Sequence, residues 1–287
     1  MSSPFEIAIN DHDVLGEGPW WSPRDGVLWR VDILGQTLHS WNPVSGASEH
    51  WPVGEDLGFA VPTSDGRLVL GLRSGIAIFD PATGEQEPLI QTPGSAQSRF
   101  NDGKTDRQGR VWAGTIVDDL TVRNGVFGRL DANDFHIGAD DLGISNGLGW
   151  SPDNATMYLT DSAIGTIWAY DFDSDTARMT NRRTFAVDND CEPDGLTVDA
   201  EGGVWSAKWD GGRVVRYDAD GVISEVVEIP VSRPTSCSFG GPGLDTLFVT
   251  SASVGLDEDE CASTGAGAVF AMTPGVIGIA ETEARVD

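Results

Sequence analysis

Four short segments carry acidic or amide side chains directly before apolar stretches, and these residue types suit chemistry at a metal ion. Glu17 lies in GEGPWW, Asn146 in SNGLGW and Asp194 in PDGLTV, while FNDGKT contains Asn101 and Asp102. Each lies at nearly the same distance ahead of a polar turn. Oxygen donors without a thiol or clustered histidines suit a hard divalent ion, calcium or magnesium, with manganese or zinc as alternatives.

The recurring turn indicates which elements would bring these residues together. SPRDG, TSDG, DRQG, SPDN, DAEG and GPGLD each precede an apolar or aromatic segment. Their marker residues are spaced by 40, 43, 45, 48 and 43 residues, and they are Gly26, Gly66, Gly109, Asn154, Gly202 and Asp245. Six units of this length predict an all-β, six-bladed β-propeller with four-stranded antiparallel blades around a central channel. No linker interrupts the pattern, so we expect residues 1–287 to form a single domain.

The innermost strands of a propeller run along its channel, so equivalent positions on them converge although they are distant in sequence. We therefore expect Glu17, Asn146 and Asp194 to share one divalent ion. The alternative is that each side chain only caps a local turn. The segment FEIAIN has no place in the first unit, and we expect it to complete the last blade and close the ring.

Composition excludes several classes of function. The chain has 18 Lys+Arg against 45 Asp+Glu, a net charge of −27, which disfavours nucleic acids and anionic membranes as partners. We find no signal peptide and no long apolar run, and expect a cytoplasmic protein. The three cysteines form no CxxC motif and should be free thiols. The Asp-rich, Lys-poor composition fits a salt-rich cytoplasm, but a compositional bias of the genome would give the same pattern.

Longer segments resemble the regucalcin (senescence marker protein) and gluconolactonase family. They are LGEGPWW, RFNDGKTDRQGRVWAGT, ISNGLGWSPDNATMYLTDS, EPDGLTVDAEGGVWSAKWDGGRVVRYD and TSCSFGGPGLDTLFVTSA, and the likeness extends in order from Leu15 to Ala271. The resemblance implies a six-bladed propeller with one divalent ion in its channel, and an enzyme that hydrolyses an aldonolactone such as glucono-, xylono- or arabinonolactone. It also implies that Glu17, Asn146 and Asp194 are the metal ligands.

The resemblance further implies roles in catalysis and substrate binding. Asp194 would be the base that takes a proton from the attacking water, a role that also suits its expected place at the metal. Arg99 and Asn101 match residues that contact the sugar, although an arginine here could instead pair with one of the many acids. Asp119 stands where the family has a sugar-contacting glutamate, and its shorter reach leaves the ring size and hydroxyl preference of the substrate open.

Three other functions compete with a metal-dependent lactonase. The segment Gly143–Gly147 fits G-x-S-x-G, but a strand pattern follows Ser145 and all four histidines precede it, so a serine hydrolase is not expected. A metal-dependent esterase or phosphotriesterase could use the same ion, and a non-catalytic calcium-binding propeller would need neither Arg99 nor Asn101. The expected partner is a small sugar lactone. The native lactone, the ion used and the choice between a monomer and a weak homo-oligomer stay open.

Overall fold

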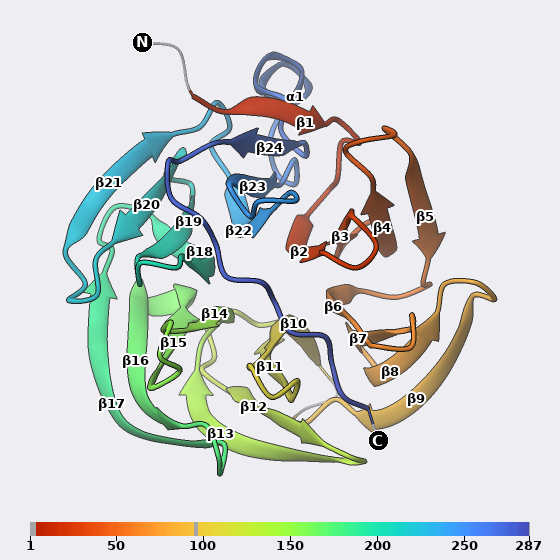
Figure 1. Cartoon of the computed structure of the whole chain (residues 1–287), viewed down its shortest axis with the longest axis vertical. Helices are drawn as coiled ribbons and strands as arrows, with labels where there is room; N and C mark the ends of the chain where they lie inside the picture. Colours follow the sequence, from red (N-terminus) through yellow and green to blue (C-terminus); the bar gives the residue numbers. More distant parts are fainter. Residues whose placement is uncertain (1–3, 95–96, 287) are drawn as a thin grey trace.

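Six four-stranded antiparallel sheets form a ring around a central axis in the computed structural model (Figure 1). The structure describes residues 4–94 and 97–286. In five blades the strands follow one another in chain order, beginning with the strand at the channel. The six-bladed propeller predicted from the spacing of the turns is confirmed.

The first three blades alternate strands and tight turns. Blade 1 contains β2 (Gly16–Ser22), β3 (Val27–Asp32), β4 (Thr37–Trp41) and β5 (Ser48–Pro52). Blade 2 contains β6 (Leu57–Pro62), β7 (Leu68–Leu72), β8 (Gly75–Asp80) and β9 (Glu85–Gln91). Blade 3 contains β10 (Ser98–Thr105), β11 (Val111–Val117), β12 (Gly125–Asp131) and β13 (Asp134–Leu142).

The other three blades complete the ring. Blade 4 contains β14 (Ser145–Trp150), β15 (Thr156–Asp161), β16 (Thr166–Asp173) and β17 (Arg178–Val187). Blade 5 contains β18 (Glu192–Val198), β19 (Val204–Trp209), β20 (Arg213–Tyr217) and β21 (Ile223–Glu228). Blade 6 contains β22 (Pro234–Gly240), β23 (Thr246–Ser251), β24 (Val269–Met272) and the N-terminal strand β1 (Glu6–Ile9). Because β1 pairs antiparallel with β24, the expected closure by the N-terminal strand is confirmed.

Two short helices lie in loops, η1 (Ser162–Ile164) and α1 (Glu258–Thr264). The side chain of Asp257 caps α1 by accepting a hydrogen bond from the Glu260 N–H. Within residues 4–94 and 97–286, no helix is long and apolar enough to cross a membrane.

The recurring turns are built by aspartates that hold their own backbone. Asp106 accepts hydrogen bonds from two backbone N–H groups of its turn and from the indole of Trp112, at 3.0 Å. Asp199 repeats the arrangement, with the Trp205 indole at 2.9 Å. The spacing of aspartate, glycine and tryptophan in these two repeats therefore serves the same hydrogen bonds, which also satisfy a buried indole donor.

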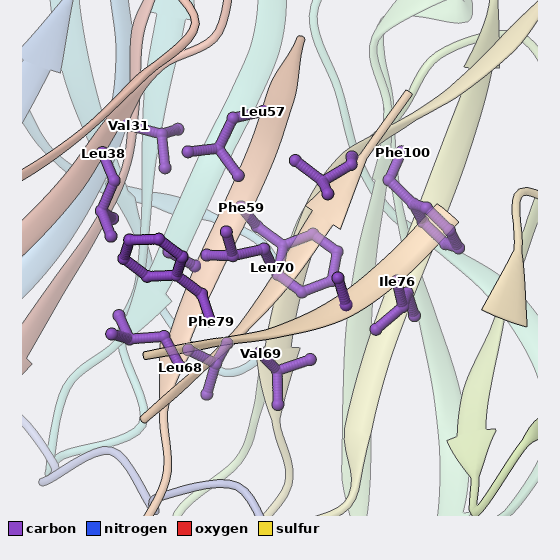
Figure 2. Packing of buried hydrophobic residues seen from close by; sticks show 14 of the residues in the cluster. Val31, Leu38, Leu57, Phe59, Leu68, Val69, Leu70, Ile76, Phe79 and Phe100 are labelled. Carbon is purple, nitrogen blue, oxygen red and sulfur yellow. The ribbon is translucent and has the colours of Figure 1, made fainter. Parts of the chain in front are cut away.

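Apolar side chains from neighbouring blades fill the space between the sheets. Figure 2 shows such a cluster around blade 2, where Phe59 of β6 meets Phe100 of β10 with the rings nearly perpendicular and their centroids 6.0 Å apart. A Cβ atom at Gly103 would lie 2.6 Å from the Phe59 ring, so this glycine makes room for the contact. Trp20 and Trp21 are buried in the core, so neither offers a stacking face to a sugar.

The segment after β24 runs across the middle of the ring (Figure 1). It hydrogen-bonds to the turns between first and second strands: Ala284 N–H donates to Pro62 O at 2.8 Å, and Arg285 N–H donates to Gly109 O at 2.8 Å. These turns follow the ends of the inner strands. The C-terminal segment therefore covers the end of the channel opposite to the strand starts, which carry the candidate site residues.

Close contact between inner strands depends on glycines after the candidate site residues. A Cβ atom at Gly147 would lie 2.5 Å from both Asp194 O and Leu196 N, and one at Gly195 would lie 2.0 Å from Ser236 Oγ. Real Cβ atoms do not approach backbone atoms this closely, so the inner strands would have to separate.

We expect Gly147→Ala to lower the free energy of unfolding by about 1–3 kcal/mol, because the added methyl group overpacks the contact between blades 4 and 5. Urea denaturation measures this loss. Gly243→Ala is the control, since its Cβ would meet only the exposed Asp245 side chain, at 3.3 Å. Equal stability losses in the two variants would contradict the proposed role of Gly147.

Candidate metal centre and active site

The inner strands are irregular where the candidate residues lie. The pairing register with the second strand shifts in all six inner strands. Four of these shifts lie at the candidate residues, at Glu17–Trp20 in β2, Phe100–Gly103 in β10, Ser145–Leu148 in β14 and Pro193–Leu196 in β18. A bulge of this kind leaves residues out of the ladder and redirects their side chains. The acidic and amide residues that the sequence singles out all fall within these irregular segments.

Glu17, Asn146 and Asp194 are all buried, although they come from blades 1, 4 and 5. The charge of Glu17 acts on Asp194, and the charge of Asp102 from blade 3 acts on both carboxylates. Charges act on one another in this way only over short distances, so these three carboxylates form one electrostatic cluster. Their role as metal ligands stays a prediction.

The surroundings of the cluster oppose negative charge. Burial, with Asp102 adding to it, raises the pKa of Glu17 to about 8, although the Gly18 N–H donates to its Oε2 atom at 3.0 Å. Burial and the charge of Glu17 raise the pKa of Asp194 well above its ordinary value. Burial also raises the pKa of Asp102 to about 6, against the opposing charge of Lys104. A cation among these groups would relieve both the burial cost and the repulsion.

Asn146 Oδ1 and Asp194 Oδ1 are buried and have no hydrogen-bond partner among the described residues, and the same is true of the neighbouring Ser145 Oγ. Asn146 Nδ2 donates to Ser162 Oγ at 3.2 Å, which leaves the amide oxygen as the free end of that side chain. Buried polar atoms normally have partners, so an unpaired carboxylate oxygen and an unpaired amide oxygen fit a hard divalent cation. No group of three or more His, Cys, Asp or Glu in the described ranges could hold a metal, so a site here would need a ligand of another type, such as the Asn146 amide.

Arg99 and Asn101 form a hydrogen-bonded arm beside the acids. Arg99 Nη1 donates to Asn101 Oδ1 at 2.8 Å and to Phe100 O at 3.0 Å, and Asn101 Nδ2 donates to Ser145 O at 3.0 Å. Burial lowers the pKa of Arg99 to about 10, while the charge of Asp56 opposes this shift. Arg99 thus stays charged at neutral pH and is joined through Asn101 to the inner strand of blade 4.

Asp119 lies apart from these contacts. It is exposed in the loop after β11, and its Oδ1 atom accepts hydrogen bonds from Thr121 N at 3.0 Å and Thr121 Oγ1 at 2.6 Å, which lower its pKa. Among the described residues it makes no hydrogen bond or ion pair with Arg99 or Asn101. Its contact with the sugar stays a prediction.

Three charged residues join the site without having been assigned a role from the sequence. Asp102 follows Asn101 in FNDGKT, and this position in the repeat is the feature of the sequence that points to it. Lys104 follows on the same strand and pairs with Glu281 of the C-terminal segment at 3.0 Å. Asp56 lies in the connection before β6, where the repeat pattern gives no signal, and its Oδ2 atom is 4.0 Å from Arg99 Nε.

The serine-elbow motif does not form the structure that a serine nucleophile needs. Ser145 begins β14, and the next element is the strand β15 instead of a helix. The adjacent Asn146 is the residue of this segment that lies in the candidate metal centre.

Comparison with known proteins places the chain in a family. Residues 15–253 match the family model described as "SMP-30/Gluconolactonase/LRE-like region". The chain belongs to this family. A 6-deoxy-6-sulfogluconolactonase of Pseudomonas putida is 37% identical over 286 residues, with 98% of each chain covered. The pentonolactonase XacC of Haloferax volcanii is 35% identical over 283 residues, with 95% of each chain covered.

Solved structures show the same relationship. A calcium-binding protein from Agrobacterium tumefaciens, named regucalcin, superimposes with a TM-score of 0.92 at 27% identity, and all of both chains is covered. The SMP-30/gluconolactonase family therefore contains both sugar lactonases, which are carboxylic ester hydrolases, and calcium-binding regucalcins. The resemblance inferred from the sequence motifs is confirmed.

In chelator-treated protein, we expect the free energy of unfolding to fall as the pH rises from about 5 to 8. The pKa of Glu17 is about 8 in the folded protein against an ordinary 4.5, so the folded state binds more protons than the unfolded state between these values. Denaturation in urea with EDTA, at several pH values, measures the slope.

Glu17→Gln should flatten this slope in part, because Asp102 and Asp194 contribute with the same sign. Glu201→Gln, at an exposed position on the β18–β19 turn, should leave it unchanged. A wild-type stability that does not change between pH 5 and 8 would contradict the raised pKa of Glu17.

Proposed function

We propose that the protein hydrolyses a sugar-acid lactone to the open-chain sugar acid with the help of one divalent ion, calcium first among the candidates. Glu17, Asn146 and Asp194 would hold the ion. The observation that carries the proposal is the pair of unpaired buried oxygens, Asn146 Oδ1 and Asp194 Oδ1, in an acidic cluster beside the Arg99–Asn101 arm. Membership of a family that contains sugar lactonases supports a sugar lactone as the substrate.

The acids and the arm divide the work of ring opening. A divalent ion held by the three ligands would polarise the lactone carbonyl and acidify a nearby water. Asp194 takes a proton from the attacking water while the oxygen of that water bonds to the carbonyl carbon. When the bond from that carbon to the ring oxygen breaks, the same proton passes from Asp194 to the departing oxygen, which becomes a hydroxyl group. The products are one carboxylic acid and one alcohol on a single open chain.

Arg99 and Asn101 would orient the sugar. A guanidinium can present two parallel donors to hydroxyl or ring oxygens, and an amide can donate and accept at once. The bond between Arg99 Nη1 and Asn101 Oδ1 keeps the two groups in a fixed relation, which favours one orientation of the ring. Asp119 would contribute a further hydroxyl contact if its loop turned the carboxylate inward.

The test is a panel of five- and six-membered aldonolactones, assayed beside an aryl phosphotriester after chelation and re-addition of single cations. We expect lactone hydrolysis to be lost with EDTA and restored by calcium, zinc, manganese or magnesium. Faster turnover of the phosphotriester would favour the esterase alternative. Cation binding without turnover of any substrate would favour a non-catalytic calcium-binding propeller.

Asp194→Ala should abolish turnover and weaken cation binding, because it removes both the base and a ligand. Steady-state rates and calorimetric titration with calcium measure the two effects. Glu201→Gln, an exposed substitution in the same blade, serves as the control. Near-normal rates in Asp194→Ala would reject the assignment of the base.

Arg99→Ala should lower kcat/KM by about tenfold or more while the cation is retained, as expected when a charged hydrogen-bond donor to the substrate is lost. The same kinetic and calorimetric measurements apply. If this variant instead lost the ion, Arg99 would be needed for the metal centre and its assignment to the substrate would be wrong.

A further inference from the structure

A chain of charged side chains connects the protein surface to Arg99. Arg73, in the loop between β7 and β8, forms two hydrogen bonds with Asp118, Nη1 to Oδ2 at 3.1 Å and Nη2 to Oδ1 at 3.0 Å. The same guanidinium contacts Asp56 Oδ2 from Nη2 at 2.8 Å and from Nε at 3.2 Å. Arg73 is thus clamped between carboxylates from blades 2 and 3.

Asp56 connects this clamp to the substrate-binding arm. The Oδ2 atom that accepts from Arg73 is also 4.0 Å from Arg99 Nε, and Oδ1 accepts from Gln36 Nε2 at 3.4 Å. The Asp56 side chain is only 12% exposed and that of Arg99 only 9%, so water screens their attraction weakly. In contrast, Arg73 and Asp118 are 37% and 50% exposed and form the outer, solvated end of the chain.

Several carboxylates act on Arg99. Asp56 Oδ2 lies 4.0 Å from its Nε atom, and the charge of Glu17, the proposed metal ligand, acts on the same guanidinium. Without Asp56, the charges of Glu17 and Asp118 would still attract Arg99, and Glu17 is the buried one of the two. Arg99 would then leave its position beside Asn101 and compete with the cation for a ligand oxygen.

The charge balance indicates orientation of Arg99 as the role of this chain, and not capture of an anion. Two arginines face two aspartates, so the four side chains have no net charge to offer to an anionic ligand. The outer pair, being solvent-exposed, adds little stability by itself. The outer pair matters more for geometry than for stability. Two parallel hydrogen bonds to Asp118 leave the Arg73 guanidinium little freedom, and Arg73 in turn holds Asp56 in place.

We propose that Asp56 is a positioning residue for substrate binding: fixed by Arg73 and Asp118, it keeps the Arg99 guanidinium beside Asn101 and away from Glu17. The inference rests on the proposed function, because the partner of Arg99 is taken to be the lactone. It assigns Asp56 no contact with the substrate. Its effect passes through Arg99.

The first test is Asp56→Asn, which keeps the shape and the acceptor for Arg73 but removes the charge. We expect KM for the best lactone of the panel to rise about tenfold, while kcat changes by less than about threefold, because the reacting groups are untouched. Asp56→Glu restores the charge and should recover part of the increase in KM. Asp65→Asn is the matched control, since Asp65 pairs with Arg67 at 2.7 Å on the far turn of the same blade.

The second readout follows Arg99 directly, without turnover. The ¹H–¹⁵N signal of the Arg99 Nε–H group, assigned by its absence in Arg99→Lys, should shift in Asp56→Asn and exchange faster with water. Calorimetric titration should show weaker calcium binding in Asp56→Asn, because Arg99 now competes for Glu17. Asp65→Asn should change neither measurement.

The results of these measurements decide whether Asp56 positions Arg99. An unchanged KM together with an unchanged Nε–H signal in Asp56→Asn overturns the proposal. If Asp56→Asn does not fold, as judged by circular dichroism, Asp118→Asn at its exposed position decides by the same measurements, with a smaller rise in KM expected. If wild-type protein turns over no lactone, the proposed function fails, and the Nε–H signal and calcium affinity alone judge the role of Asp56.

Discussion

Mutual repulsion among buried carboxylates is the constraint on which this structure depends. Three different blades contribute the carboxylates of Glu17, Asp102 and Asp194. Burial raises the pKa of all three, and the negative charges of Glu17 and Asp102 raise the pKa of Asp194 further. No local segment could hold these groups together, because they are far apart in sequence. The closed ring holds them, and the pairing of β1 with β24 is what closes it. The bulges in the inner strands then aim the side chains into the space that the ring encloses.

The centre has two parts with different physical characters. The oxygen cluster lacks hydrogen-bond donors at Asn146 Oδ1 and Asp194 Oδ1 and is suited to a cation. The Arg99–Asn101 arm is rich in donors, is internally bonded, and is suited to a neutral, hydroxylated molecule. A family with both calcium-binding and lactone-hydrolysing members is what one would expect of such a centre, because the first part can bind an ion without the second.

Much of the fold could be predicted because its signal is local and repeated. Asp106 in blade 3 and Asp199 in blade 5 build the same turn with the same hydrogen bonds, so the recurrence of this turn along the sequence gives the length of a blade. The acids of the centre could be predicted because they share a register with those turns. Asp56 could not, because it lies in a connection between blades, where no repeated hydrogen-bond pattern constrains the sequence. The path of the C-terminal segment also had no signal, since its contacts are backbone bonds to distant turns.

That segment has a consequence for exchange with solvent. The tail lies across one end of the channel, where Glu281 pairs with Lys104. In the proposed reaction the substrate would therefore reach the centre from the strand-start end. Substrate and product would then pass through the same end of the channel, one after the other. In the proposed reaction a neutral ring enters and an anion departs past a rim that carries Asp118 and Asp119, so the charge created by the chemistry itself would help to expel what has been made.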